Sequence, residues 1–140
     1  MKKIICIVVI TFLLSHTKSF AQTINLPADS ISTLLCKKWE VNYAIMGGMK
    51  ITQIPGSPEI SYEFNRDNTF LMTSNDPKEK DKGTWVYDTK KKTIKLSING
   101  NNNTIIVSLK EGELIMLVDT KEATPNDPMA LKIVYKIKAK

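Results

Sequence analysis

The chain has 140 residues and a formal net charge of +6, from 20 Lys and Arg against 14 Asp and Glu. This length corresponds to a single domain. The positive charge is modest, and most of it falls in predicted turns or on the outward side of a predicted strand. The composition therefore argues against a protein that binds nucleic acid.

The first 21 residues have the pattern of a secretory signal peptide. Lys2 and Lys3 precede an apolar run over residues 4–14, and Ala21 is a small residue suited to the cleavage site. The run is shorter than the roughly 20 residues that a transmembrane span needs, so we expect none. We expect removal of residues 1–21 and an exported protein, periplasmic or secreted. The alternative is an uncleaved membrane anchor.

Cleavage would remove the only histidine, His16, and one of the two cysteines, Cys6. The remaining cysteine, Cys36, has no partner for an intrachain disulfide. A zinc site would lack ligands, and no serine or cysteine nucleophile would have histidine as its base. We therefore expect no metal, no cofactor and no enzymatic activity.

Residues 22–34 are expected to form a polar lead and a short helix. Asp29 or Ser30 can cap a helix that runs towards Lys37, with Ile31 and Leu35 on its apolar side.

From Trp39 onwards the hydrophobic period changes from 3.6 to 2, which is typical of β-strands. Segments rich in Asn, Asp and Gly separate the alternating runs. The sequence predicts eight strands, at residues 39–46, 60–65, 69–74, 83–88, 92–99, 104–109, 113–118 and 130–137. Most gaps are too short for parallel crossovers, so consecutive strands pair antiparallel. Pairing the first strand with the last removes both edges, which predicts an all-β, eight-stranded, antiparallel up-and-down barrel.

One predicted turn carries alternating charges. Its acidic residues are Asp76, Glu79 and Asp81, and lysines lie between and beside them. The spacing does not match a calcium-binding loop, so we interpret the segment as a hydrophilic turn that neutralises its own charge.

Three segments of the domain are similar to a known family. They are residues 35–39 (LCKKW), residues 62–70 (YEFNRDNTF) and residues 82–88 (KGTWVYD). In this order they resemble the lipocalin-like (calycin) barrels, in particular the small exported lipocalin-like domains of Bacteroidetes. The resemblance implies a lipocalin-like barrel over residues 35–140, with Trp39 as a structural plug in the floor of the barrel.

The alternation also predicts which side chains point into the barrel. An eight-stranded barrel is either filled by its side chains or able to hold one small ligand, and both alternatives stay open. The candidate ligand-binding residues are Tyr43, Tyr62, Phe64, Phe70, Met72, Trp85, Tyr87, Met116 and Tyr135. Four of them are tyrosines, and a buried tyrosine hydroxyl needs a partner that a solvated or ligand-filled pocket can provide. This favours a cavity slightly.

Two predicted loops are long, at residues 47–59 and 119–130. Four apolar residues in or beside the first are candidates for a lid over the barrel mouth, because methionine suits adaptable apolar contacts. They are Met46, Met49, Ile51 and Ile54. The alternative is a loop folded back as a cap on the core.

Two functions are compatible with this sequence. The first is an exported lipocalin-like protein that holds a small hydrophobic or amphipathic molecule in the barrel. The second is a barrel with a filled core that acts as a protein-interaction or inhibitor module, with another protein of the cell envelope as its partner.

Overall fold

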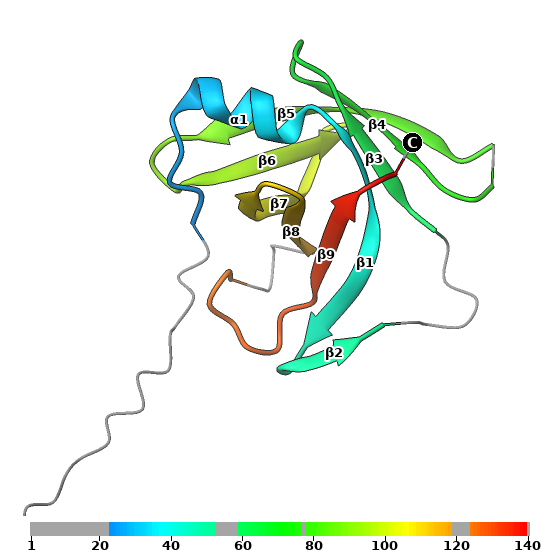
Figure 1. The fold of residues 1–140 in the computed structure, drawn as a ribbon, viewed down its shortest axis with the longest axis vertical. Coiled ribbons are helices and arrows are strands. Elements are labelled where there is room, and N and C mark those ends of the chain that lie inside the picture. The colour runs from blue at the N-terminus through cyan, green and yellow to red at the C-terminus, as the bar shows by residue number, and fades with distance from the viewer. Residues whose placement is uncertain (1–22, 53–58, 77, 119–123, 140) are drawn as a thin grey trace, which may run out of the picture.

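The computed structural model describes residues 23–52, 59–76, 78–118 and 124–139. Within these ranges, one helix precedes a series of strands (Figure 1). The elements are α1 (Ala28–Leu35), β1 (Lys38–Met46), β2 (Met49–Ile51), β3 (Ser61–Phe64), β4 (Thr69–Thr73), β5 (Lys80–Asp88), β6 (Thr93–Ile98), β7 (Asn101–Lys110), β8 (Glu113–Val118) and β9 (Lys132–Ile137). The predicted signal peptide and Ile54 lie outside the described residues. No described helix is both long and apolar enough to cross a membrane.

The strands form a closed antiparallel barrel. From β3 to β9 each strand pairs with the next, and β1 pairs with both β3 and β9. The pairing of β1 with β9 runs from Trp39 opposite Ile137 to Ile45 opposite Lys132. The predicted eight-stranded barrel with a short N-terminal helix is therefore confirmed.

A further strand, β2, lies where the sequence predicted a loop. Gly47 and Gly48 form a two-residue turn in which both φ angles are positive, 58° and 75°. Glycine adopts this conformation without strain, and it matches the twist of a tight hairpin. Met46 pairs with Met49 across the turn, so β1 and β2 form a hairpin at the end of the barrel away from α1 (Figure 1).

The helix closes one end of the barrel. Its buried residues Ile31 and Leu35 face the core, and the Trp39 indole Nε1–H donates a hydrogen bond of 2.9 Å to the Leu35 carbonyl. The lead before the helix crosses the same end, where the Tyr87 hydroxyl donates to the Ile24 carbonyl at 3.0 Å. Trp39 is fully buried. It therefore joins the helix to the floor of the barrel.

Aromatic rings fill the interior next to this floor. Tyr62 lies 5.8 Å from Phe64, 5.7 Å from Phe70 and 5.5 Å from Tyr135, measured between ring centroids. Such separations are typical of attractive aromatic pairs. The Trp85 indole packs in the same core and donates to the Asn65 carbonyl at 3.1 Å. This part of the barrel is packed with side chains.

A β-bulge overturns the prediction that Tyr43 points into the barrel. The register of β1 with β9 shifts between Val41 and Tyr43. One extra residue moves every following side chain to the opposite face. Tyr43 pairs with Val134, which pairs with Ile115 on the outer wall, and the Lys50 ammonium lies 4.1 Å from the centroid of the Tyr43 ring. Tyr43 is therefore part of the outer surface.

A second bulge shapes the opposite wall. The register of β7 with β8 shifts between Ile106 and Ser108, and Ile106 is fully buried in the interior core. Val107 instead packs with Leu117 and Ala130 in a small cluster of its own. The segment that leads into β9 thus covers part of the outer wall.

Gly83 in β5 has no room for a side chain. A Cβ atom there would lie 2.5 Å from the Ser97 carbonyl oxygen and 2.7 Å from Phe70 Cε1, and the Phe70 ring is itself buried. We expect Gly83→Ala to lower the free energy of unfolding by about 1–3 kcal/mol, the usual cost of overpacking. Urea denaturation measures this difference. Thr84→Ala, at the next, outward-facing position, is the control and should change stability by less than about 0.5 kcal/mol. Equal stability of the two variants would contradict the close packing at Gly83.

Candidate functional site

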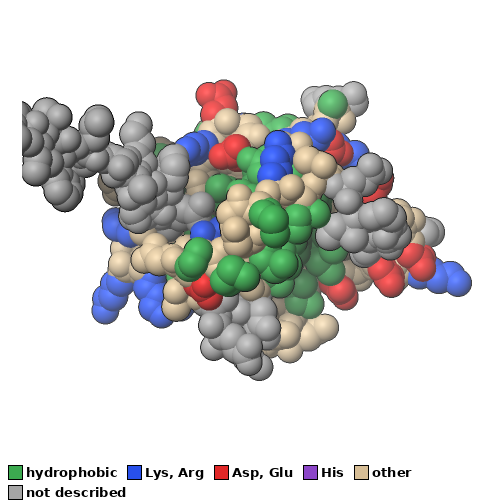
Figure 2. Space-filling view, turned by 90° about the horizontal axis from the view of Figure 1, so that it is seen from below, with side chains coloured by type: hydrophobic (Ala, Val, Ile, Leu, Met, Phe, Trp, Pro, Cys, Tyr) green, Lys and Arg blue, Asp and Glu red, His purple; other side chains and the backbone are tan. Residues whose placement is uncertain are grey.

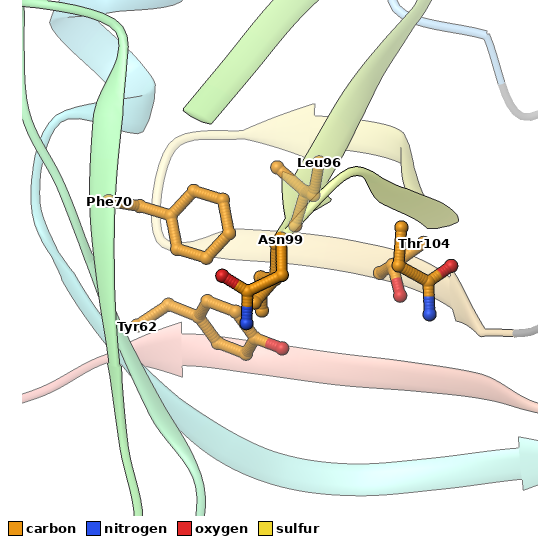
Figure 3. Close-up of a pocket in the computed structure, with 7 residues that line it drawn as sticks. Tyr62, Phe70, Leu96, Asn99 and Thr104 are labelled. Atoms are coloured by element: carbon orange, nitrogen blue, oxygen red, sulfur yellow. The ribbon is translucent and has the colours of Figure 1, made fainter. Parts of the chain in front are cut away.

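The end of the barrel opposite α1 holds a pocket of about 340 Å³, here called the mouth pocket. Its lining residues come from β3, β4, β6, β7 and the β6–β7 turn (Figure 3). They are Tyr62, Phe70, Leu96, Ile98, Asn99, Asn101 and Thr104. The volume lies within the range of about 300–1,000 Å³ that is usual for small-molecule sites.

The strand register explains why these side chains meet. Tyr62, Phe70 and Leu96 are buried inward-facing residues of three different strands. Across the β6–β7 hairpin, Leu96 pairs with Thr104 and Ile98 pairs with Asn101, and a register shift lies between the two pairs. All four residues line the mouth pocket. The lower wall of the mouth pocket is therefore apolar, and its β7 side adds an amide and a hydroxyl.

The β6–β7 turn supplies another polar group. Asn99 and Gly100 both have positive φ, 51° and 79°, which asparagine and glycine tolerate better than other residues. The Asn99 amide lies beside the rings of Phe70 and Tyr62 (Figure 3). An apolar floor beneath a rim of neutral polar groups suits an amphipathic molecule.

Tyr62 and Tyr135 form a buried pair at the floor of the mouth pocket. Their rings are nearly perpendicular, at 85°. Burial raises the pKa of both phenols, and the proximity of the two hydroxyls lowers the pKa of Tyr62 and raises that of Tyr135. The Asp81 carboxylate also raises the pKa of Tyr62. Both phenols are thus uncharged at neutral pH.

The structure brings two of the nine candidate ligand-binding residues, Tyr62 and Phe70, to the mouth pocket. The other seven candidates do not line the mouth pocket. Phe64, Trp85, Met116 and Tyr135 are core residues, Tyr87 meets the N-terminal lead, Met72 lines an adjoining hollow and Tyr43 faces outward.

The argument from tyrosine hydroxyls does not hold for Tyr87. Its hydroxyl donates to the Ile24 carbonyl at 3.0 Å, so it finds its partner within the chain. The presence of Tyr87 therefore gives no sign of a cavity.

Sequence reasoning missed five residues of the mouth pocket. Leu96 and Ile98 belonged to the predicted inward alternation, but they were not chosen as candidates. Asn99, Asn101 and Thr104 are polar and lie at or beside a predicted turn. The signal that could have found them was the position of the β6–β7 turn. This turn lies at the open end of the barrel, so its polar residues lie next to the inward-facing side chains.

Three of the lid candidates, Met46, Met49 and Ile51, lie in the β1–β2 hairpin. Ala44 pairs with both Ile51 and Ile133, and Ile133 packs against the interior core. Met46 and Met49 share this face because they pair two positions further along. The inner wall of the barrel thus continues past its rim along the β1–β2 hairpin.

This extension leaves apolar surface exposed at the open end (Figure 2). Met49 is 66% exposed and Met129 is 65% exposed. The two residues lie near the same turn, since the Gly47 N–H donates to the Pro128 carbonyl at 3.0 Å. The mouth is therefore flanked by flexible apolar side chains.

Comparison of the chain with known protein families, with curated proteins and with solved structures gives no match. The closed eight-stranded barrel is compatible with a lipocalin-like fold, and that compatibility rests on architecture alone. Among the described residues, no three His, Cys, Asp or Glu side chains gather where they could hold a metal ion.

The tyrosine pair should make the protein less stable at alkaline pH. A phenol with a raised pKa in the folded state holds its proton more tightly when folded. Its stabilising effect is complete below the unfolded pKa near 10 and is lost as the pH rises towards the folded value. We expect the free energy of unfolding to fall above pH 10, and Tyr135→Phe to flatten that fall.

Urea denaturation at several pH values from about 9 to 11 measures both slopes. The two proteins differ only at residue 135, so the difference between the slopes reports on the Tyr62–Tyr135 pair. Identical slopes for the wild type and Tyr135→Phe would show that burial does not hold the proton on this hydroxyl.

Proposed function

We propose that this chain is an exported lipocalin-like binding protein that holds a small hydrophobic or amphipathic molecule in the mouth pocket. The observation that carries the proposal is the mouth pocket itself, about 340 Å³ at the open end of a barrel whose other end is closed. Its apolar floor can bury a ligand's carbon atoms at about 25 cal/mol per Å². Its amide and hydroxyl groups can orient the polar end.

The apolar face of the β1–β2 hairpin supports an entry route. A hydrophobic molecule reaching the mouth would meet Met46 and Met49 before the floor residues. Methionine adapts its shape to different apolar partners. The hairpin would therefore collect ligands of varied shape and pass them along a continuous apolar surface.

Export belongs to the same proposal. It is supported by the signal-peptide pattern of residues 1–21, which lie outside the described residues. The mass of the protein recovered from its host tests it. Cleavage after Ala21 is the expected result, and recovery of the uncleaved chain from the cytoplasm would contradict it.

Filling the mouth pocket should abolish binding. An uncharged dye such as N-phenylnaphthylamine has roughly 17 non-hydrogen atoms, and at about 0.3 kcal/mol each its Kd should be about 0.2 mM or tighter. Thr104→Trp places an indole in the mouth pocket, and we expect it to weaken binding at least about tenfold. Dye fluorescence measures the change.

Val86→Trp is the matched control, because Val86 is exposed on the outer wall of β5. It adds the same indole without entering the barrel, so dye binding should stay as in the wild type. Equal dye binding by the wild type and Thr104→Trp would place the dye elsewhere and contradict the proposal.

The second candidate function is a module that binds another protein of the envelope. The filled interior and the exposed Met49 and Met129 favour it. Under this function, Met49→Ser with Met129→Ser abolishes capture of a specific envelope protein, and Thr104→Trp leaves capture intact. Under the ligand-binding function, Thr104→Trp is the damaging variant.

A further inference from the structure

Nearly all charged residues of the described barrel strands lie on the outer wall. Lys38 pairs with Glu63 and Lys136 pairs with Glu40 on the outer wall, and Lys95 lies opposite Val86 on the same wall. By the same register, every lysine in a described strand points away from the interior. Asp81 is the one charged residue of the described strands at an inward position.

Three directly paired residues fix the position of Asp81. Tyr62 pairs with Met72, and Met72 pairs with Asp81, so the three share the inner face in one row across β3, β4 and β5. Directly opposite side chains lie about 5 Å apart, which puts Asp81 about 10 Å from Tyr62. Tyr62 lines the mouth pocket, and Asp81 lies two strands away from it on the same inner face, beyond Met72.

Asp81 also borders open space. With Met72 and Ile60 it lines a hollow of about 380 Å³ beside the mouth pocket. Lys78, Glu79 and Lys80 border this hollow as well, and Glu79 accepts a hydrogen bond of 2.8 Å from the Ser74 hydroxyl. The ion pairs found among the described residues, Lys95–Asp88 and Lys136–Glu40, do not involve Asp81.

We propose that the molecule held in the mouth pocket carries a cationic amine and that Asp81 is its counter-ion. This inference rests on the proposed function and adds the chemical class of the ligand. An amine that extends from the mouth pocket past Met72 meets the Asp81 carboxylate, whereas the head group of a fatty acid would meet a like charge there. No described strand offers an inward lysine or arginine to hold an anion. The neutral groups of Asn99, Asn101 and Thr104 complete the polar rim.

Three probes that share the same eight-carbon chain but differ in their head groups separate the effect of charge from apolar binding. Octanol, octylamine and octanoate are titrated into the full mature chain by calorimetry at low and high salt. We expect octylamine to bind about three- to fivefold tighter than octanol, as for a solvent-exposed ion pair, and octanoate to bind more weakly than octanol. High salt should reduce the advantage of the amine.

Two matched variants assign the effect to one carboxylate. Asp81→Asn should bring the affinity for octylamine down to that for octanol and leave octanol binding unchanged. Glu63→Gln removes an exposed carboxylate from the outer wall and should keep the amine preference. Thermal melts of both variants confirm that they are folded.

The outcomes distinguish the two proposals. If no probe binds the wild type, the proposed function fails and this inference fails with it. If octanol binds but octylamine has no advantage, or if Asp81→Asn keeps the advantage, the proposed function stands and the amine inference is overturned. Tighter binding of octanoate would overturn it too, and would point to Lys78 at the edge of the hollow.

Discussion

The pairing of β1 with β9 is the constraint on which the rest of the structure depends. It joins the first and last strands of the barrel, so both edges find hydrogen-bond partners and the inward side chains become a closed core. β1 also pairs with β3 at one end and with β2 at the other. The single bulge between Val41 and Tyr43 allows one strand to close the barrel and then extend past its rim.

The two ends of the barrel differ because the chain closes only one of them. At the α1 end, the Trp39 indole N–H donates to the Leu35 carbonyl of α1. The Tyr87 hydroxyl donates to the Ile24 carbonyl in the lead before the helix. At the mouth, residues of β3, β4, β6, β7 and the β6–β7 turn line the mouth pocket. Rigid packing at one end and an accessible pocket at the other suit a scaffold that supports a binding site.

Much of this architecture follows from patterns visible in the sequence. Alternation from Trp39 onwards predicts the strands, and short polar gaps predict antiparallel pairing. The change of period at Trp39 separates the helix from the barrel. These features depend on local chemistry, because each hairpin is determined by its own turn and its own alternating faces. That is why all eight barrel strands were predicted close to their positions.

The site was harder to predict because it depends on register between strands. A bulge adds one residue without interrupting the alternation, so the sequence cannot show that Tyr43 turns outward. Likewise, no pattern shows that the Tyr62 ring packs nearly perpendicular to the Tyr135 ring in the core. The Gly47-Gly48 pair was a readable hairpin signal, and treating it as part of a long loop hid β2.

The most direct test of this account is an NMR titration of the isotope-labelled protein with octylamine. The account predicts saturable shifts, with one ligand per chain, confined to Tyr62, Asp81, Thr104 and the Asn99–Asn101 turn, while α1 and the outer wall stay unchanged. Shifts centred on the α1 end of the barrel or on the outer wall would contradict the claim that the open end of the barrel is a binding site. The absence of saturable shifts at millimolar ligand would contradict it too.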